Sequence, residues 1–140
     1  MEFALKSNSQ RFILASIAVF AFLFFYEIAV YNYALAFLFK DAFTPLIKPE
    51  EPAYFSLSIL LQVSLAIGIT CCYNYLVKRL KETPPSFGVA LGLFMGTLTA
   101  SRYLVLPVSI SLGMSWFLWS INEGITIGFL LNYFYRLKKD

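Results

Sequence analysis

The chain has 140 residues, of which 59% are hydrophobic and only 14% are charged, whereas about a quarter of the residues of a soluble domain are charged. A soluble globule of this size buries only about two-thirds of the surface that its unfolded chain exposes. Many of the 15 Phe and 9 Tyr residues would then face water. The composition therefore excludes an ordinary soluble domain and a disordered chain.

The absence of histidine narrows the possible chemistry. It excludes imidazole-ligated haem, zinc sites of the histidine type and Ser-His-Asp catalysis. We therefore expect no metal and no cofactor, and the sequence favours a protein that is not an enzyme, with an enzyme kept as an alternative below.

Most charged residues occur in four short clusters that divide the chain into apolar intervals. These intervals are residues 12–39, 52–77 and 83–135, and a membrane span needs about 20 apolar residues. The first two intervals hold one helix each, and the third is long enough for two helices joined by a turn near Pro107. We therefore predict an all-α fold, an integral membrane four-helix bundle forming a single domain over residues 1–140. Its predicted spans lie near residues 12–38, 54–77, 86–106 and 111–134.

The basic residues that flank these spans predict the orientation. If the N-terminus is cytoplasmic, eight of them face the cytoplasm, and only Lys40 and Lys48 face outward. Short cytoplasmic loops carry an excess of Lys and Arg, so both termini are expected in the cytoplasm and the protein in the inner (cytoplasmic) membrane. The net charge of +3 then reflects this bias and attraction to anionic lipids, and no nucleic acid partner is expected.

Small residues recur every four positions in the third span and form a ridge along one side of the expected helix. This pattern lets helix backbones approach closely in lipid, where packing rather than a hydrophobic force drives association. A shorter ridge follows in the fourth span. We expect at least one ridge to pack inside the bundle, and the other could mediate a homo-oligomer. The ridges consist of Gly88, Gly92, Gly96 and Ala100, and of Gly124 and Gly128.

Three ionisable residues, Glu27, Arg102 and Glu123, lie inside predicted spans. Each costs at least about 2.5–3.5 kcal/mol in the membrane interior, so a compensating arrangement is expected. Asn122 and Gln62 are placed to join them between the four helices. One arginine cannot neutralise two carboxylates, so we expect one acid to hold a proton while the other pairs with Arg102.

Two other interpretations of these ions remain open. The cluster could be a purely structural network that fixes helix register. Alternatively, Arg102 could extend its side chain to the outer interface and meet neither acid.

The overall plan resembles that of small bacterial four-span inner-membrane proteins of unknown function. The resemblance rests on the Phe/Tyr-rich first span, the segment from Gly88 to Tyr103, and the segment from Trp116 through Asn122 to Gly128. It implies the four-span architecture and carries no activity or functional residue with it.

Three functions follow as hypotheses. The first is a membrane protein whose central Glu27, Arg102 and Glu123 cluster binds or conducts a proton or small polar solute, as a homo-oligomer in the lipid bilayer. The second is an interaction or assembly subunit of a larger membrane complex, with ions that only fix register. The third, a membrane enzyme acting on lipid or quinone, has the weakest basis, because no activated nucleophile is evident.

Overall fold

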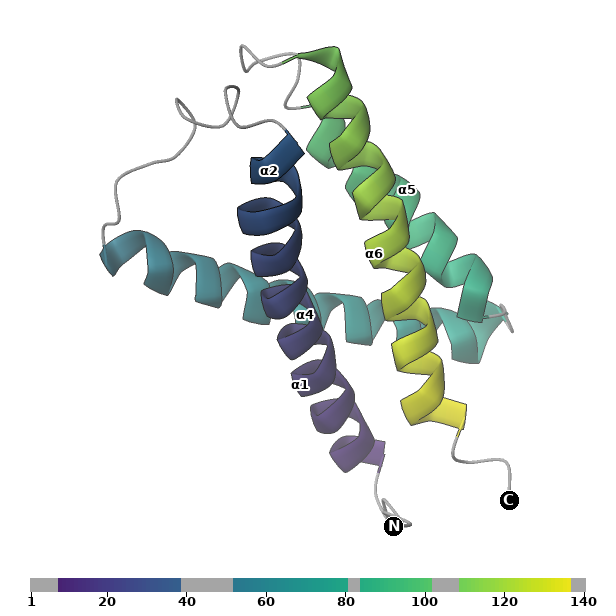
Figure 1. Ribbon diagram of the computed structural model, residues 1–140. Coiled ribbons are helices and arrows are strands. Elements are labelled where there is room, and N and C mark those ends of the chain that lie inside the picture. Colours follow the sequence, from purple (N-terminus) through teal and green to yellow (C-terminus); the bar gives the residue numbers. More distant parts are fainter. Residues whose placement is uncertain (1–7, 39–51, 81–83, 102–108, 137–140) are drawn as a thin grey trace.

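The structure, a computed structural model, describes residues 8–38, 52–80, 84–101 and 109–136 (Figure 1). All of these residues except Ser109 are helical, and none of them forms a strand. The all-α class predicted from the sequence is confirmed.

Four long helical stretches make up the described chain. The first is continuous from α1 through the π-helical segment η1 into α2. The four stretches contain the four predicted spans, except that residues 102–106 of the third span, like the predicted turn at Pro107, lie outside the described residues. The elements are α1 (Asn8–Glu27), η1 (Ile28–Leu35), α2 (Ala36–Leu38), α4 (Pro52–Leu80), α5 (Pro84–Ser101) and α6 (Ile110–Arg136).

Local sequence signals set the start of three helices. Pro52 and Pro84 are the first residues of α4 and α5, a position that suits proline because the first turn needs no partner for its N–H. Ser109 caps α6: its side-chain Oγ accepts a hydrogen bond from the Leu112 N–H at 3.3 Å. Its carbonyl oxygen accepts from the N–H groups of Leu112 and Gly113. Serine is among the preferred residues at this position.

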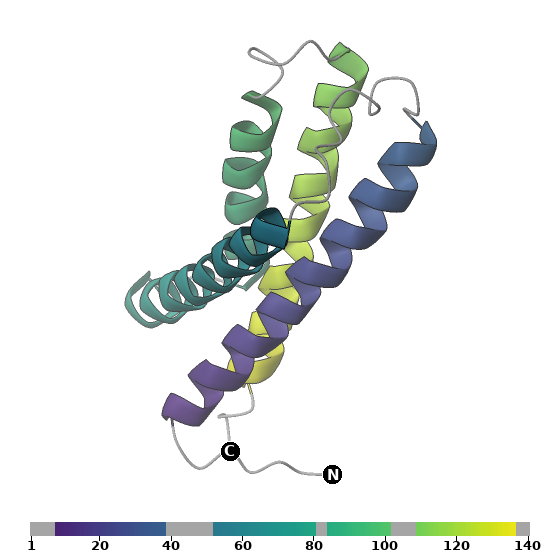
Figure 2. The ribbon, with the colours of Figure 1, turned by 90° about the vertical axis from the view of Figure 1, so that its left-hand side faces the viewer.

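The antiparallel pair of α5 and α6 is the closest helix contact in the described chain, and both views show the two helices side by side (Figures 1 and 2). Their backbones touch at the glycines. A Cβ atom on Gly92 would lie 2.8 Å from the Cα of Ile121, and one on Gly124 would lie 2.7 Å from the carbonyl oxygen of Gly88. Real Cβ atoms are not found so close to backbone, so glycine is required here.

The two glycine ridges face each other across this contact. A Cβ on Gly88 would lie 3.0 Å from the carbonyl oxygen of Gly124 and 3.3 Å from the Cα of Gly128. Ala100, the last member of the α5 ridge, is half-buried. The prediction that at least one ridge packs inside the bundle agrees with this contact, in which both ridges take part. Self-association stays a prediction.

The helix α4 lies across the others. In Figure 1 it runs across the molecule behind α1, while α1, α5 and α6 follow similar directions. In Figure 2 the first turn of α4 points toward the viewer. Both views place the first turn of α1 and the last turn of α6 at the same end. The bundle expected from the sequence has four helices side by side; in the structure three are aligned and the fourth crosses them.

The core lies where α1, α4 and α6 meet near the start of α5. Tyr73 of α4 is 1% exposed, and its ring packs against those of Phe87 and Tyr135 at centroid distances of 5.0 and 5.4 Å. Around this core are the side chains that are fully or almost fully buried. They are Ala15, Val19, Leu23, Ala66, Ile69, Ile127 and Leu131.

Two helical segments are long and apolar enough to cross a membrane. They are Ser9–Val30, with a mean hydropathy of 2.3, and Ser56–Leu76, with a mean hydropathy of 1.7. The apolar segment Ser86–Ser101 is shorter. The helix α6 has 27 residues, but Asn122 and Glu123 in its middle lower its hydropathy. By length and composition, these two segments are thus the candidate membrane spans among the described residues.

The contact between α5 and α6 predicts a contrast between two glycine substitutions. Gly124→Ala should lower the free energy of unfolding by about 1–3 kcal/mol, because the added methyl group meets the backbone of α5 and forces the helices apart. Gly68→Ala in α4 should leave stability unchanged or raise it by up to about 1 kcal/mol, because nothing lies within 4 Å of its Cβ position and alanine favours the helix. Thermal unfolding in mild detergent, followed by circular dichroism, measures both. Equal stabilities of the two variants would contradict the observed contact.

Candidate functional site

A cluster of polar side chains joins α1 to both α4 and α6 near the middle of the molecule. It contains Tyr26 and Glu27 of α1, Gln62 of α4, and Asn122 and Glu123 of α6. Tyr26 and Glu27 are consecutive, so their side chains leave α1 about 100° apart. This angle lets the two residues reach different neighbouring helices.

The carboxylate of Glu27 is bound to α4. The amide Nε2 of Gln62 donates a hydrogen bond to Glu27 Oε2. The amide oxygen of the same Gln62 is buried and has no hydrogen-bond partner among the described residues. Glu27 itself is exposed, so its carboxylate is accessible to a ligand or an ion while it holds α4.

The hydroxyl group of Tyr26 is bound to α6. It donates to the backbone carbonyl oxygen of Trp119 at 2.8 Å and accepts from Asn122 Nδ2 at 3.3 Å. The ring of Tyr26 also meets the indole of Trp119 edge to face, with a centroid distance of 6.4 Å. Tyr26 is partly buried, and its hydroxyl, which needs a partner away from water, has two on one helix.

Glu123 completes the cluster from α6. Its side chain is partly buried and interacts electrostatically with both Glu27 and Tyr26. Two acidic groups on different helices therefore share one environment. Arg11 is the one basic residue whose side chain the structure describes, and it precedes Glu27 by sixteen residues, about 24 Å along the helix.

The helix changes its geometry directly after Glu27. The segment η1 begins at Ile28 and continues to Leu35. Stretches of π-helix are rare and often occur at functional sites, since the wider turn leaves backbone groups and side chains in positions that an α-helix does not provide. The π-helical segment of this chain thus starts at a residue of the polar cluster.

The structure brings together four of the five residues that the sequence placed in a ligand or proton site: Glu27, Gln62, Asn122 and Glu123. Arg102, the fifth, lies outside the described residues. Tyr26 was missed. Its position next to Glu27 in the middle of an apolar span, where a hydroxyl needs a partner, is the signal that could have found it.

The described residues offer no other cluster for chemistry of this kind. No group of three or more Cys, Asp or Glu side chains in this part of the chain could hold a metal ion. Cys71 and Cys72 are free thiols on the exposed surface of α4. The functional candidates are therefore the two carboxyl groups and their polar neighbours.

The chain matches no protein-family profile, no curated protein and no solved structure. The geometry of the site therefore carries the functional argument.

The double hydrogen bond of Tyr26 predicts a specific loss of stability. Tyr26→Phe should lower the free energy of unfolding by about 1 kcal/mol, because it removes the hydroxyl that binds Trp119 and Asn122 while keeping the ring. Tyr33→Phe is the matched control, since Tyr33 is 72% exposed. Thermal unfolding in detergent compares the two variants, and an unchanged Tyr26→Phe protein would show that this link between α1 and α6 contributes nothing.

Proposed function

We propose that the protein is a multi-pass protein of a cytoplasmic-type membrane that binds, and moves across the membrane, a proton or a small cation at Glu27 and Glu123. Gln62, Tyr26 and Asn122 orient these carboxyl groups. The proposal takes the four helical stretches as four spans with both termini in the cytoplasm. The proposal also includes self-association, because several copies of the chain can enclose a pathway that one copy does not enclose alone.

The surface of the described chain supports a lipid environment. Many large apolar side chains point away from the core, among them Phe25 at 69% exposed, Phe94 at 65% and Leu118 at 61%. They belong to three different helices, so they do not form one interface for a soluble partner. Apolar side chains on all sides of a helical protein are typical of contact with lipid.

The crossing of α4 is compatible with a span. Its 29 residues measure about 43 Å at 1.5 Å per residue, against a hydrocarbon thickness of about 30 Å. A helix longer than the bilayer is thick accommodates the difference by tilting. The excess length thus allows α4 to tilt strongly and still reach both surfaces.

The single observation that carries the function is the electrostatic interaction between two carboxyl groups, Glu27 of α1 and Glu123 of α6, that belong to one polar cluster. In a medium of low dielectric constant two like charges repel strongly, so the pair needs a positive charge or a proton. The side chains described around the pair supply amide, hydroxyl and carboxyl groups and no cation. A proton or a small cation satisfies both acids, and ionisable groups inside spans characteristically mark such pathways.

Flux measurements test this function. Proteoliposomes with Glu27→Gln or Glu123→Gln should show at least about tenfold slower proton or cation flux than wild type, because an amide neither releases a proton nor balances a cation. Thr97→Val is the control, since the Thr97 hydroxyl binds the Leu93 carbonyl of its own helix outside the cluster. Unchanged flux in Glu123→Gln, or wild-type vesicles no more permeable to protons, Na⁺ or K⁺ than empty ones, would refute the proposal.

Cysteine labelling tests the orientation. In a chain carrying Cys71→Ser and Cys72→Ser, Lys139→Cys should resist a membrane-impermeant maleimide in intact cells and react after the cells are broken. Lys48→Cys should react in intact cells, since the excess of basic residues places it outside. The reverse pattern would contradict cytoplasmic termini. Labelling of both variants in intact cells would place residues 48 and 139 on the same side, and would contradict the three crossings that the proposal places between them.

A further inference from the structure

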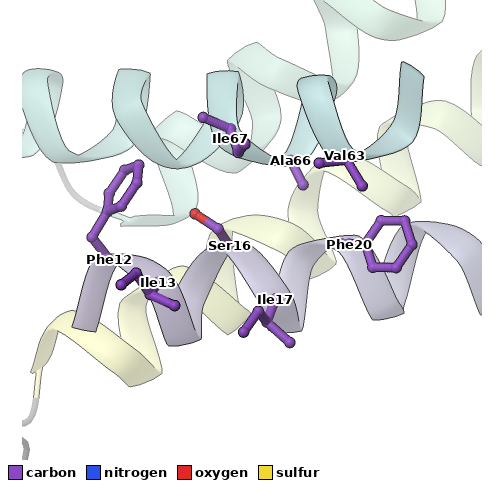
Figure 3. A pocket seen from close by; sticks show the side chains of 8 residues that line it. All are labelled: Phe12, Ile13, Ser16, Ile17, Phe20, Val63, Ala66 and Ile67. Carbon is purple, nitrogen blue, oxygen red and sulfur yellow. The ribbon is translucent and has the colours of Figure 1, made fainter. Parts of the chain in front are cut away.

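A cleft of about 270 Å³ opens between α1 and α4 (Figure 3). Phe12 and Phe20 of α1 stand at its two ends, and α4 contributes Val63 and Ala66. Among the eight side chains that line the cleft, Ser16 alone is polar. The site is separate from the polar cluster, because Ser16 precedes Glu27 by eleven residues, about 16 Å along α1.

The hydroxyl of Ser16 is buried without a partner. Ser16 is 9% exposed, and its Oγ forms no hydrogen bond with any described residue. Six other hydroxyls in the described helices bind the carbonyl oxygen four residues earlier. They do so in the pairs Ser64 with Leu60, Thr70 with Ala66, Thr97 with Leu93, Thr99 with Met95, Ser115 with Ser111 and Thr126 with Asn122. Ser16 has no such partner, and its side chain adjoins the cleft.

The size and lining of the cleft select its occupant. An apolar cavity of about 150 Å³ holds one benzene molecule, so 270 Å³ suits a substituted or fused ring. An ordered water needs about two to four polar partners, and the cleft offers a single hydroxyl. An apolar ring between the two Phe side chains, with one oxygen for Ser16, fits both features.

We propose that this cleft binds a ring compound of the quinone type, dissolved in the membrane, whose carbonyl oxygen accepts a hydrogen bond from Ser16. A carbonyl brings no donor of its own, so one hydroxyl satisfies it. The Ser16 oxygen is directed toward α4 (Figure 3) and is buried there. The proposal therefore requires rotation about the Cα–Cβ bond to another staggered position, which needs no movement of the backbone. The proposal concerns binding alone and does not depend on ion movement at Glu27.

A pair of matched probes tests the site. Dimethylnaphthoquinone with both free quinone carbons methylated avoids reaction with the exposed thiols of Cys71 and Cys72, and dimethylnaphthalene is the same ring system without carbonyl groups. Binding is measured as the excess of each probe in lipid nanodiscs containing the protein over empty nanodiscs. The quinone should bind wild-type protein about fivefold more tightly than the hydrocarbon, the effect of one hydrogen bond.

Three variants separate the hydrogen bond from the cavity. Ser16→Ala should abolish the preference for the quinone and leave hydrocarbon binding intact. Ile17→Trp should weaken both probes, because Ile17 lines the cleft and is 57% exposed, so the larger ring fills the space without entering the core. Ser64→Ala, which removes a hydroxyl bonded to its own helix, should change neither. Equal binding of both probes to wild type, or an unchanged preference in Ser16→Ala, would overturn the proposal and leave a groove filled by lipid tails.

Discussion

The backbone contact between α5 and α6 is the constraint on which the rest of the arrangement depends. Gly88 and Gly92 meet Gly124 with no space for a Cβ atom, so α6 is held against α5 along one line. Trp119 and Asn122 lie on a different side of α6, and it is this side that binds Tyr26. The α5–α6 pair therefore acts as a fixed platform, and α1 is placed by hydrogen bonds and ring contacts to it.

The contact between α1 and α4 is of a different kind. The two helices cross, share a short line of contact around Ala15, Ala66 and Ile69, and enclose a cleft beside it. In a membrane, polar contacts between helices contribute only about 0.6–2 kcal/mol each. The Glu27–Gln62 hydrogen bond thus adds a polar link to the apolar packing between α1 and α4. Both candidate sites adjoin the contact between α1 and α4, and the polar cluster also includes Asn122 and Glu123 of α6.

The sequence predicts the parts of the structure that depend on local signals. The lengths of the apolar intervals predict four helical stretches, and the four-residue spacing of Gly88, Gly92 and Gly96 predicts a line of close contact. Spacing identifies a face but not its partner, so the mutual contact of the two ridges could not be derived. The crossing of α4 could not be derived either, since its apolar residues surround the helix and select no orientation. The roles of Tyr26 and Ser16 could not be predicted, because one hydroxyl in an apolar span does not reveal its hydrogen-bond partner. Only the structure shows that the partners of Tyr26 lie on another helix and that Ser16 has none among the described residues.

The position of Glu27 links its chemistry to the arrangement of the helices. Tyr26 binds α6 and the next residue, Glu27, binds α4, so α1 connects the fixed pair to the crossing helix through two consecutive side chains.

A charged acceptor makes a stronger hydrogen bond than a neutral one. Under the proposed function, a proton or cation at Glu27 therefore weakens its bond to Gln62, while the bonds of Tyr26 to α6 remain. A ligand shifts a conformational equilibrium by its difference in affinity for the two states. Occupancy of the carboxyl pair therefore favours a state in which α1 and α4 are bound less tightly to each other. The π-helical segment starts at Ile28, directly after Glu27, where this loosening of α1 from α4 would begin.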